Sequence, residues 1–154
     1  MDLSSLLRPE AVKIATSFTS KKRLFQEIGE LAETLHDVPA RRVVEALQDR
    51  ESLGPTGVGG GIALPHARID SIGHVAGIFI RAEKPFDFGS VDRKSVDLVF
   101  ALLAPEDAGV EHLKALAVVS RTMRDAGLCK KLRSNSDPAT LHAMLTEAQQ
   151  SKAA

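Results

Sequence analysis

One stretch of the chain combines a reactive side chain with a permissive backbone. "GPTGVGGGIALPHARI", residues 54–69, has five glycines in its first eight residues, followed by an apolar run that ends in Pro65 and His66. An imidazole can act as a nucleophile, a general base or a metal ligand near neutral pH. Strand ends beside loops are where α/β folds place their sites, which favours a functional role for His66. A hydrogen-bonded structural histidine is the alternative, and the residues alone leave both open.

The glycines match neither of the common nucleotide-binding loops. A P-loop requires a lysine and a hydroxyl residue directly after its glycines, whereas Ile62 and Ala63 follow here. A dinucleotide fingerprint lies between a strand and a helix in that order, and this chain has a predicted helix followed by a predicted strand. The glycines therefore either turn the chain back into a sheet or leave a surface without side chains, which another protein's backbone could approach closely.

A metal or cofactor site is not predicted. His66 has no histidine four residues further on, and no cluster of cysteines or carboxylates accompanies it. Cys129 is the one cysteine of the chain, so no intrachain disulfide can form. No base lies beside it in the sequence, which favours a buried structural thiol.

The composition argues against several classes of partner. The 154 residues include 20 basic and 20 acidic side chains, so no net charge attracts nucleic acid or an anionic membrane. Tryptophan and tyrosine are absent and phenylalanine occurs six times, which leaves few surfaces on which bases could stack. The N-terminus lacks the features of a signal peptide, and no apolar run reaches the about 20 residues of a membrane span. We therefore expect a cytoplasmic protein without membrane insertion.

Hydrophobic periodicity predicts helices before, between and after buried strands, which is typical of a layered α/β domain. The expected strands are residues 12–18, 61–66, 74–83 and 95–105. The expected helices are residues 19–36, 37–54, 110–124, 127–136 and 137–149. In the first helix Ser20 or Thr19 is the predicted N-cap.

The helix over residues 110–124 has one predicted apolar side. Helical spacing places Val110, Leu113, Ala117 and Ser120 together on that side, followed by Met123 or Arg124. Read from the periodicity alone, His112 lies on the polar face.

The glycine-rich segment resembles the active-site segment of the fructose/mannitol-type enzyme IIA domains of the bacterial phosphotransferase system. The family pattern is approximately Arg-Glu, a short gap, then a glycine-rich run ending in Ala-hydrophobic-Pro-His. Here Arg50 and Glu51 begin it and His66 ends it. Pro55 departs from the pattern because a hydroxyl residue is usual there, which predicts the loss of one contact to phosphate. "SVDLVFALLAP" and the pair His112-Leu113 match further family features.

The resemblance implies a fold and a set of roles. The fold is a single IIA type-2 domain over residues 1–154, with a mixed, mostly parallel sheet flanked by helices. His66 would accept a phosphoryl group from the phosphohistidine of an HPr-like carrier (NPr type), and no cofactor is needed. Arg50 would stabilise the phosphoryl charge, Thr56 would donate its hydroxyl to the phosphate, and His112 would orient His66 or bind the phosphate. The histidines without a matching motif are expected to be surface or structural residues: His36, His74 and His142.

A chain of this length without a fused IIB or IIC segment most resembles the nitrogen-regulatory (IIA-Ntr) members of the family. That type implies a phosphocarrier more than a conventional enzyme. Its phosphorylation state would control binding to other proteins, such as components of potassium transport or sensor kinases. The alternative is a sugar-specific IIA that passes phosphate to a IIB protein encoded separately.

Overall fold

The structure, a computed structural model, describes the backbone of residues 1–153 and the side chains of residues 1–147. Its strands form one sheet in the order β1-β5-β6-β3-β2, with β4 also paired to β6. The strands are β1 (Val12–Ala15), β2 (Gly57–Gly59), β3 (Ile62–Ala63), β4 (His66–Ile69), β5 (Ala76–Phe86) and β6 (Val96–Pro105).

The sheet is mixed, as expected. Within residues 1–153, β1 pairs with β5 in parallel, and β3 and β4 each pair with β6 in parallel. The two remaining pairings, β5 with β6 and β2 with β3, are antiparallel. The long β5–β6 ladder is buried on both faces, and it places Phe79 opposite Phe100. These two rings pack edge to face at 6.0 Å, which anchors the core at the centre of the sheet.

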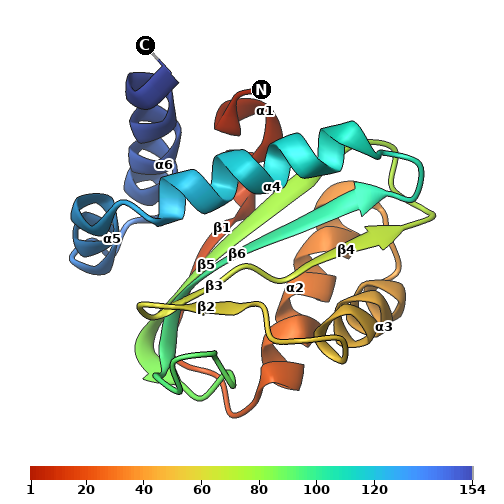
Figure 1. Ribbon diagram of the computed structural model, residues 1–154, viewed down its shortest axis with the longest axis horizontal. Helices are drawn as coiled ribbons and strands as arrows, with labels where there is room; N and C mark the ends of the chain where they lie inside the picture. Colours follow the sequence, from red (N-terminus) through yellow and green to blue (C-terminus); the bar gives the residue numbers. More distant parts are fainter. Residues whose placement is uncertain (154) are drawn as a thin grey trace.

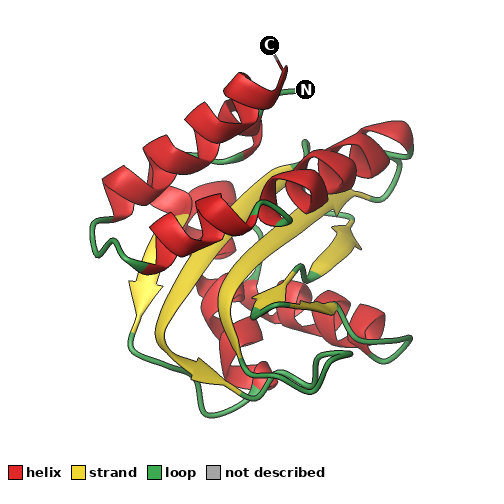
Figure 2. Cartoon of the chain, turned by 60° about the vertical axis from the view of Figure 1, so that its left-hand side comes forward, coloured by secondary structure: helices red, strands yellow, loops and turns green. Residues whose placement is uncertain are grey.

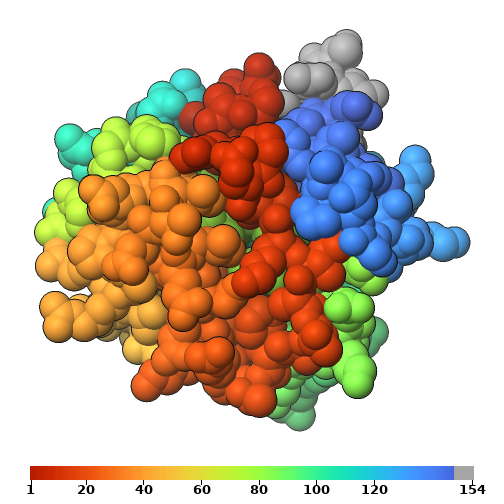
Figure 3. Space-filling model, turned by 180° about the vertical axis from the view of Figure 1, so that it is seen from behind, coloured from red at the N-terminus to blue at the C-terminus, as the bar shows by residue number. Residues whose placement is uncertain are grey.

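Helices cover both faces of this sheet, which confirms the layered α/β prediction (Figures 1 and 2). On one face lie α2 (Lys21–His36) and α3 (Ala40–Glu51), and Figure 3 shows this pair in orange from behind. On the other face α4 (Val110–Met123) crosses the sheet, followed by α5 (Ala126–Arg133) and α6 (Pro138–Ala153). The short N-terminal elements are α1 (Leu3–Leu6) and the 3-10 turn η1 (Pro9–Ala11). None of the helices in the described chain is long and apolar enough to cross a membrane.

Helix α2 begins where the sequence predicts it. The Ser20 hydroxyl accepts a hydrogen bond from the backbone N–H of Arg23, so Ser20 and not Thr19 is the N-cap. The apolar stripe below it buries Leu24 and Ile28 completely.

The strand expected over residues 61–66 is divided in two. β3 ends at Ala63, and a new strand, β4, begins at His66, where the predicted strand was expected to end. Pro65 has no N–H to donate to a ladder, and its carbonyl accepts a bond from the Leu102 amide at 2.9 Å. The glycine segment in turn contributes β2, which forms a hairpin with β3. His66 therefore stands at the first position of a strand, directly after an interruption in the sheet edge.

The buried side of α4 differs from the predicted one. Val110 and Leu113 are 61% and 65% exposed, so the first turns of the expected stripe face outward, whereas Met123 at its end is buried. The buried residues of α4 are His112, Ala115, Val118, Val119, Thr122 and Met123. Both stripes are rich in apolar residues, and periodicity alone does not decide between them. Contact with β6 selects the second, and it carries His112 into the interior with it.

Candidate functional site

Three elements converge on His66. Strand β4 lies between α3 and α4 (Figure 1), and it supplies His66 at its first position. Arg50 comes from the last turn of α3, and its Nε is 3.3 Å from Nε2 of His66. His112 comes from the first turn of α4, and the centres of the two imidazole rings are 5.7 Å apart. The structure thus brings together three residues that the sequence placed 16 and 46 positions apart.

The hydrogen bonds of His66 distinguish its two ring nitrogens. Nδ1 lies 2.9 Å from the Leu64 carbonyl oxygen, which can only accept. Nδ1 must therefore carry the proton of the neutral ring, and Nε2 retains its lone pair. The Nε–H of Arg50 donates to this lone pair, and a second nitrogen of the same guanidinium donates to the Gly54 carbonyl at 3.0 Å. The nucleophilic nitrogen of His66 is Nε2, and a permanent cation lies beside it.

His112 presents the opposite arrangement. Its Nδ1 accepts a hydrogen bond from Nε of Arg68 at 3.2 Å, which places the ring proton on Nε2. His112 is 7% exposed, and its Nε2 is buried without a hydrogen-bond partner among the described residues. A buried donor of this kind is costly unless a ligand satisfies it. The ring is therefore set to donate to a group bound between the two histidines.

Arg68 was missed by the sequence analysis. It lies two residues after His66 on β4, and side chains two apart on a strand share one face. The signal was present in "HARI", but the predicted strand ended at His66 and so concealed it. Arg68 brings a second guanidinium to the site and fixes the ring tautomer of His112.

Thr56 is turned toward Glu51. Its hydroxyl donates to one carboxylate oxygen of Glu51 at 2.7 Å, and its backbone N–H donates to the other at the same distance. Lys21 from the start of α2 also reaches this carboxylate, at 3.2 Å. The Glu51 side chain is 8% exposed, so this cluster ties the loop after α3 to two helices. The Thr56 hydroxyl is thus used within the protein, and its contact with phosphate stays a prediction.

The glycine hairpin serves as a turn and also allows close packing. Gly60 has φ +66°, a conformation that L side chains rarely adopt. Its N–H donates to Asp92 and its carbonyl accepts from Arg133, so the tip is held from both sides. At Gly57 a Cβ would lie 2.9 Å from the backbone of Ser90, so only glycine fits.

Exposed apolar side chains occur on the elements that carry the site. Leu53 is 83% exposed and follows α3, and Val58 is 54% exposed on β2. The exposed Val110 and Leu113 lie on either side of His112 in the sequence of α4. Val91 is also exposed, and its backbone N–H donates to the Gly57 carbonyl of β2. Such large apolar groups at the surface, near buried polar groups, are typical of a protein-docking face.

The remaining histidines lie apart from this cluster. Nε2 of His142 is 2.8 Å from the Leu7 carbonyl and joins α6 to the N-terminal segment. His36 and His74 pack against each other with ring centres 5.4 Å apart. The described residues contain no group of three or more histidines, cysteines or carboxylates that could hold a metal ion.

Burial lowers the pKa of both site histidines. For His66 desolvation is the largest cause, and the Arg50 cation lowers the pKa further against the opposing Leu64 hydrogen bond. For His112 burial is again first, followed by His66 and Arg68. Both rings are therefore neutral at pH 7, which is the form in which imidazole is a nucleophile.

We expect the ring of His66 to titrate with a midpoint below its ordinary pKa of 6.5. Below pH 6.5 the unfolded chain then binds protons that the folded chain does not, so the free energy of unfolding falls as the pH is lowered. Histidine NMR signals followed from pH 8 to 4 measure the midpoint, with the same chain in denaturant as reference. A midpoint at or above the reference value contradicts the assignment.

Thr56→Val is expected to lower the free energy of unfolding by about 1–3 kcal/mol, because the buried Glu51 carboxylate loses its shortest side-chain hydrogen bond. Thr56→Ser keeps the hydroxyl and is the matched control. Chemical denaturation gives the stability, and a phosphoryl-transfer assay gives the rate. Unchanged stability with a strongly reduced transfer rate would show instead that this hydroxyl acts at the phosphate.

The sequence matches one protein family and several of its members along nearly its whole length. Residues 5–148 match the sequence profile of the family described as "Phosphoenolpyruvate-dependent sugar phosphotransferase system, EIIA 2". The chain is 43% identical over 145 residues to a nitrogen regulatory protein of Bradyrhizobium diazoefficiens, covering 94% of this chain and 95% of that one. It is 36% identical over 149 residues to a nitrogen regulatory protein of Escherichia coli K12, covering 96% and 91%.

Solved structures of IIA proteins have the same fold as this chain. The crystal structure of the nitrogen regulatory protein IIA-Ntr from Neisseria meningitidis has a TM-score of 0.87 and 35% identity, covering 94% of this chain and 99% of that one. The mannitol IIA of Escherichia coli, at 20% identity and a TM-score of 0.75 over 90% of this chain and 97% of that one, shares the fold.

Proposed function

This chain belongs to the EIIA 2 family of the phosphoenolpyruvate-dependent sugar phosphotransferase system, and we propose that it is a phosphohistidine carrier that accepts a phosphoryl group on Nε2 of His66. One observation carries the proposal. The Leu64 carbonyl holds the proton on Nδ1, so the free lone pair is on the nitrogen that Arg50 contacts.

The transfer step requires no proton movement within His66. The lone pair of Nε2 attacks the phosphorus and the P–N bond to the donor's imidazole breaks. The donor ring, protonated on its other nitrogen, leaves as a neutral imidazole, and the positive charge passes to the phosphorylated ring of His66. Nδ1 of His66 keeps its proton throughout, hydrogen-bonded to the Leu64 carbonyl. The protein's task is then to position the two rings in line and to stabilise the phosphoryl oxygens.

The surrounding donors suit that task. When phosphorus bonds to Nε2, the Arg50 N–H loses its nitrogen acceptor and turns to a phosphoryl oxygen. The buried Nε2–H of His112 provides a second donor, and Arg68 behind it supplies a further positive charge. Glu51 adds little opposing charge, because Lys21 is paired with it.

The donor that fits is the phosphohistidine of a small HPr-like carrier of the NPr type. The exposed Leu53, Val58 and Leu113, on segments that adjoin Arg50, the glycine hairpin and His112, would give such a protein apolar docking contacts. For a protein with this role we expect a location in the cytoplasm, together with its donor.

Phosphorylation would also switch partner binding. A phosphoryl group adds about −1.5 to −2 charges at pH 7. A partner that covers this apolar face when His66 is neutral would then bury that charge and is expected to dissociate, unless it supplies arginine. The relatives are named nitrogen regulatory proteins, which favours a regulatory role. We propose components of potassium transport or sensor kinases as its targets. A sugar-specific role, with transfer to a IIB protein, is the alternative.

The test is incubation with a purified, phosphorylated HPr-like carrier, followed by mass-spectrometric mapping. The protein is expected to gain one phosphoryl group on His66 that is labile in acid and stable in base, as phosphoramidates are. A chase with a fructose-type IIB separates the two roles, because a regulator retains the label and a sugar IIA loses it. No incorporation, or incorporation at another residue, contradicts the proposal.

A further inference from the structure

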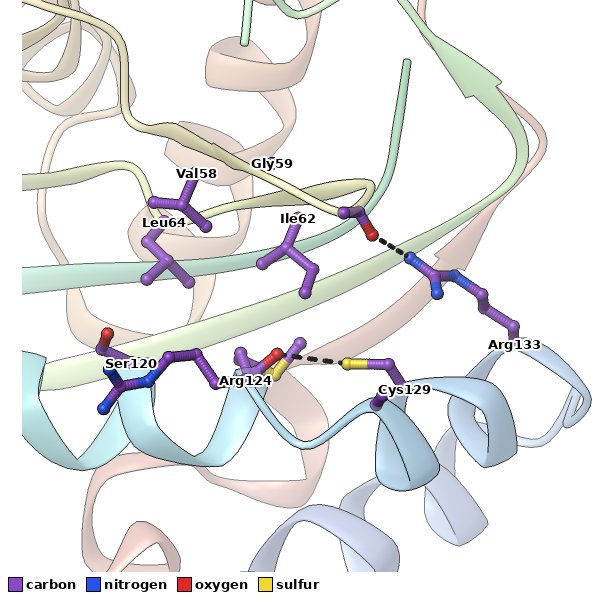
Figure 4. Close-up of a pocket in the computed structure, with 11 residues that line it drawn as sticks. Val58, Gly59, Ile62, Leu64, Ser120, Arg124, Cys129 and Arg133 are labelled. Carbon is purple, nitrogen blue, oxygen red and sulfur yellow. Dashed lines mark hydrogen bonds between the residues drawn. The ribbon is translucent and has the colours of Figure 1, made fainter. Parts of the chain in front are cut away.

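A cavity of about 350 Å³ lies between the β2–β3 hairpin and the junction of α4 with α5 (Figure 4). Its size falls within the range of small-molecule sites, about 300–1,000 Å³. In Figure 4 the side chains of Val58, Ile62 and Leu64 point from the hairpin toward the helices. Cys129 lies on the opposite wall, where burial raises the pKa of its thiol and the Sγ–H donates to the Met123 carbonyl.

Both ends of this cavity carry a guanidinium group. Arg133 lies at one end and Arg124 at the other, beside Ser120 (Figure 4). Arg124 and Ser120 are four residues apart, so they are neighbours on one helical face. The cavity therefore combines apolar walls with polar groups at its ends.

Only one of the two arginines is already paired. Arg133 makes two bonds to the Asp97 carboxylate, at 2.8 and 3.0 Å, and a third to the Gly60 carbonyl. Its charge is neutralised within the protein. The side chain of Arg124 makes no ion pair or hydrogen bond with any residue of the described chain, so its positive charge is open to an anion.

We propose that this cavity binds a small monocarboxylate with a short apolar chain, its carboxylate on Arg124 and Ser120 and its chain against Leu64, Ile62 and Val58. A water molecule occupies about 30 Å³ in the liquid, so the cavity has room for a ligand of about ten non-hydrogen atoms. A sugar or sugar phosphate fits poorly, because its hydroxyls would meet apolar walls without hydrogen-bond partners.

The ligand would touch the residue that orients His66. The side chain of Leu64 lines the cavity, and its carbonyl holds Nδ1 of His66. Occupancy is therefore sensed at the phosphoryl acceptor, and the regulatory meaning of this link rests on the proposed function. Binding itself does not depend on it, so the two can fail separately.

The test uses hexanoate as the probe and ¹⁵N-labelled protein. We expect saturable NMR shifts of the amides of Gly59, Leu64 and Cys129 and of the His66 ring, with saturation below about 10 mM. Hexanamide has the same shape without the charge, and its affinity is expected to be at least about tenfold lower than that of hexanoate. Arg124→Gln removes the preference for the acid, whereas Arg121→Gln, an exposed arginine of the same helix outside the cavity lining, keeps it.

Three results would overturn the inference: no saturable shifts with hexanoate, equal binding of acid and amide, or unchanged binding by Arg124→Gln. Shifts confined to the cavity, with the His66 ring unaffected, would remove the link to the acceptor. If hexanoate binds as described and His66 takes no phosphoryl group from any carrier, the proposed function fails and the cavity site stands.

Discussion

Replacing His66 with alanine is expected to abolish incorporation of phosphate from a phosphorylated HPr-like carrier. The reason is that Nε2 of His66 keeps its lone pair beside the Arg50 guanidinium and close to the buried N–H donor of His112. The fold should survive, since the substitution removes two partly buried side-chain hydrogen bonds, one with the Leu64 carbonyl and one from Arg50, each worth about 1 kcal/mol. Autoradiography or mass spectrometry measures the incorporation, and circular dichroism follows the fold.

His74→Ala is the matched control for that experiment. It removes an imidazole whose ring packs on His36, away from the site, and should leave incorporation unchanged. Label that persists in His66→Ala at the wild-type level would place the acceptor elsewhere.

The second large effect is expected at Arg50. Removing one charged donor from a developing oxyanion commonly slows a reaction by about 10²–10³, and Arg50→Ala should slow transfer to His66 by this order. Arg50→Lys restores the charge without the Nε–H geometry and should recover only part of the rate. Rapid-quench measurement of single-turnover transfer gives the rate, and the carrier's affinity is measured separately.

A neighbouring arginine provides the control here. Arg41 lies on the same helix with its side chain 85% exposed, so Arg41→Ala removes a charge and leaves the site intact. Its transfer rate should match that of the wild type. If Arg50→Ala also transfers at the wild-type rate, Arg50 has no part in stabilising the phosphoryl group.

The parts of this fold that depend on local chemistry were predictable. Helix α2 follows from a serine cap and a stripe of period 3.6, and both depend on residues within a few positions of each other. The mixed sheet between helix layers was expected from the resemblance, and its buried central strands from their apolar runs. His66 and Arg50 could be named because they occupy two positions of one ordered motif.

Long-range packing decided the rest. The chain offers α4 two apolar stripes, and the one containing Ala115 and Val119 was selected by contact with β6. This choice of stripe buries His112 and leaves Leu113 at the surface. Periodicity alone predicts the reverse, with His112 on the polar face and Leu113 on the buried side. The division of the strand at Pro65 likewise depends on a carbonyl bonded to β6 and hid the role of Arg68.

Glu51 illustrates a different difficulty. It stood in the family pattern beside Arg50, yet nothing local shows that its carboxylate is buried and shared by Lys21 and Thr56. Its partners come from the start of α2 and from the loop before β2, and only the fold brings them together. The resemblance predicts a contact of the Thr56 hydroxyl with phosphate, and this contact stays a prediction beside the hydrogen bond to Glu51.

The central claim is that His66 accepts the phosphoryl group on Nε2 while Nδ1 stays protonated on the Leu64 carbonyl. Protein labelled with ¹⁵N-histidine and phosphorylated by an HPr-like carrier tests this directly, because ¹⁵N shifts and ³¹P–¹⁵N coupling identify the bonded nitrogen. The predicted result is coupling to Nε2 of His66, with its Nδ1 still carrying a proton. Coupling to Nδ1, or to a ring nitrogen of any other histidine, would contradict it.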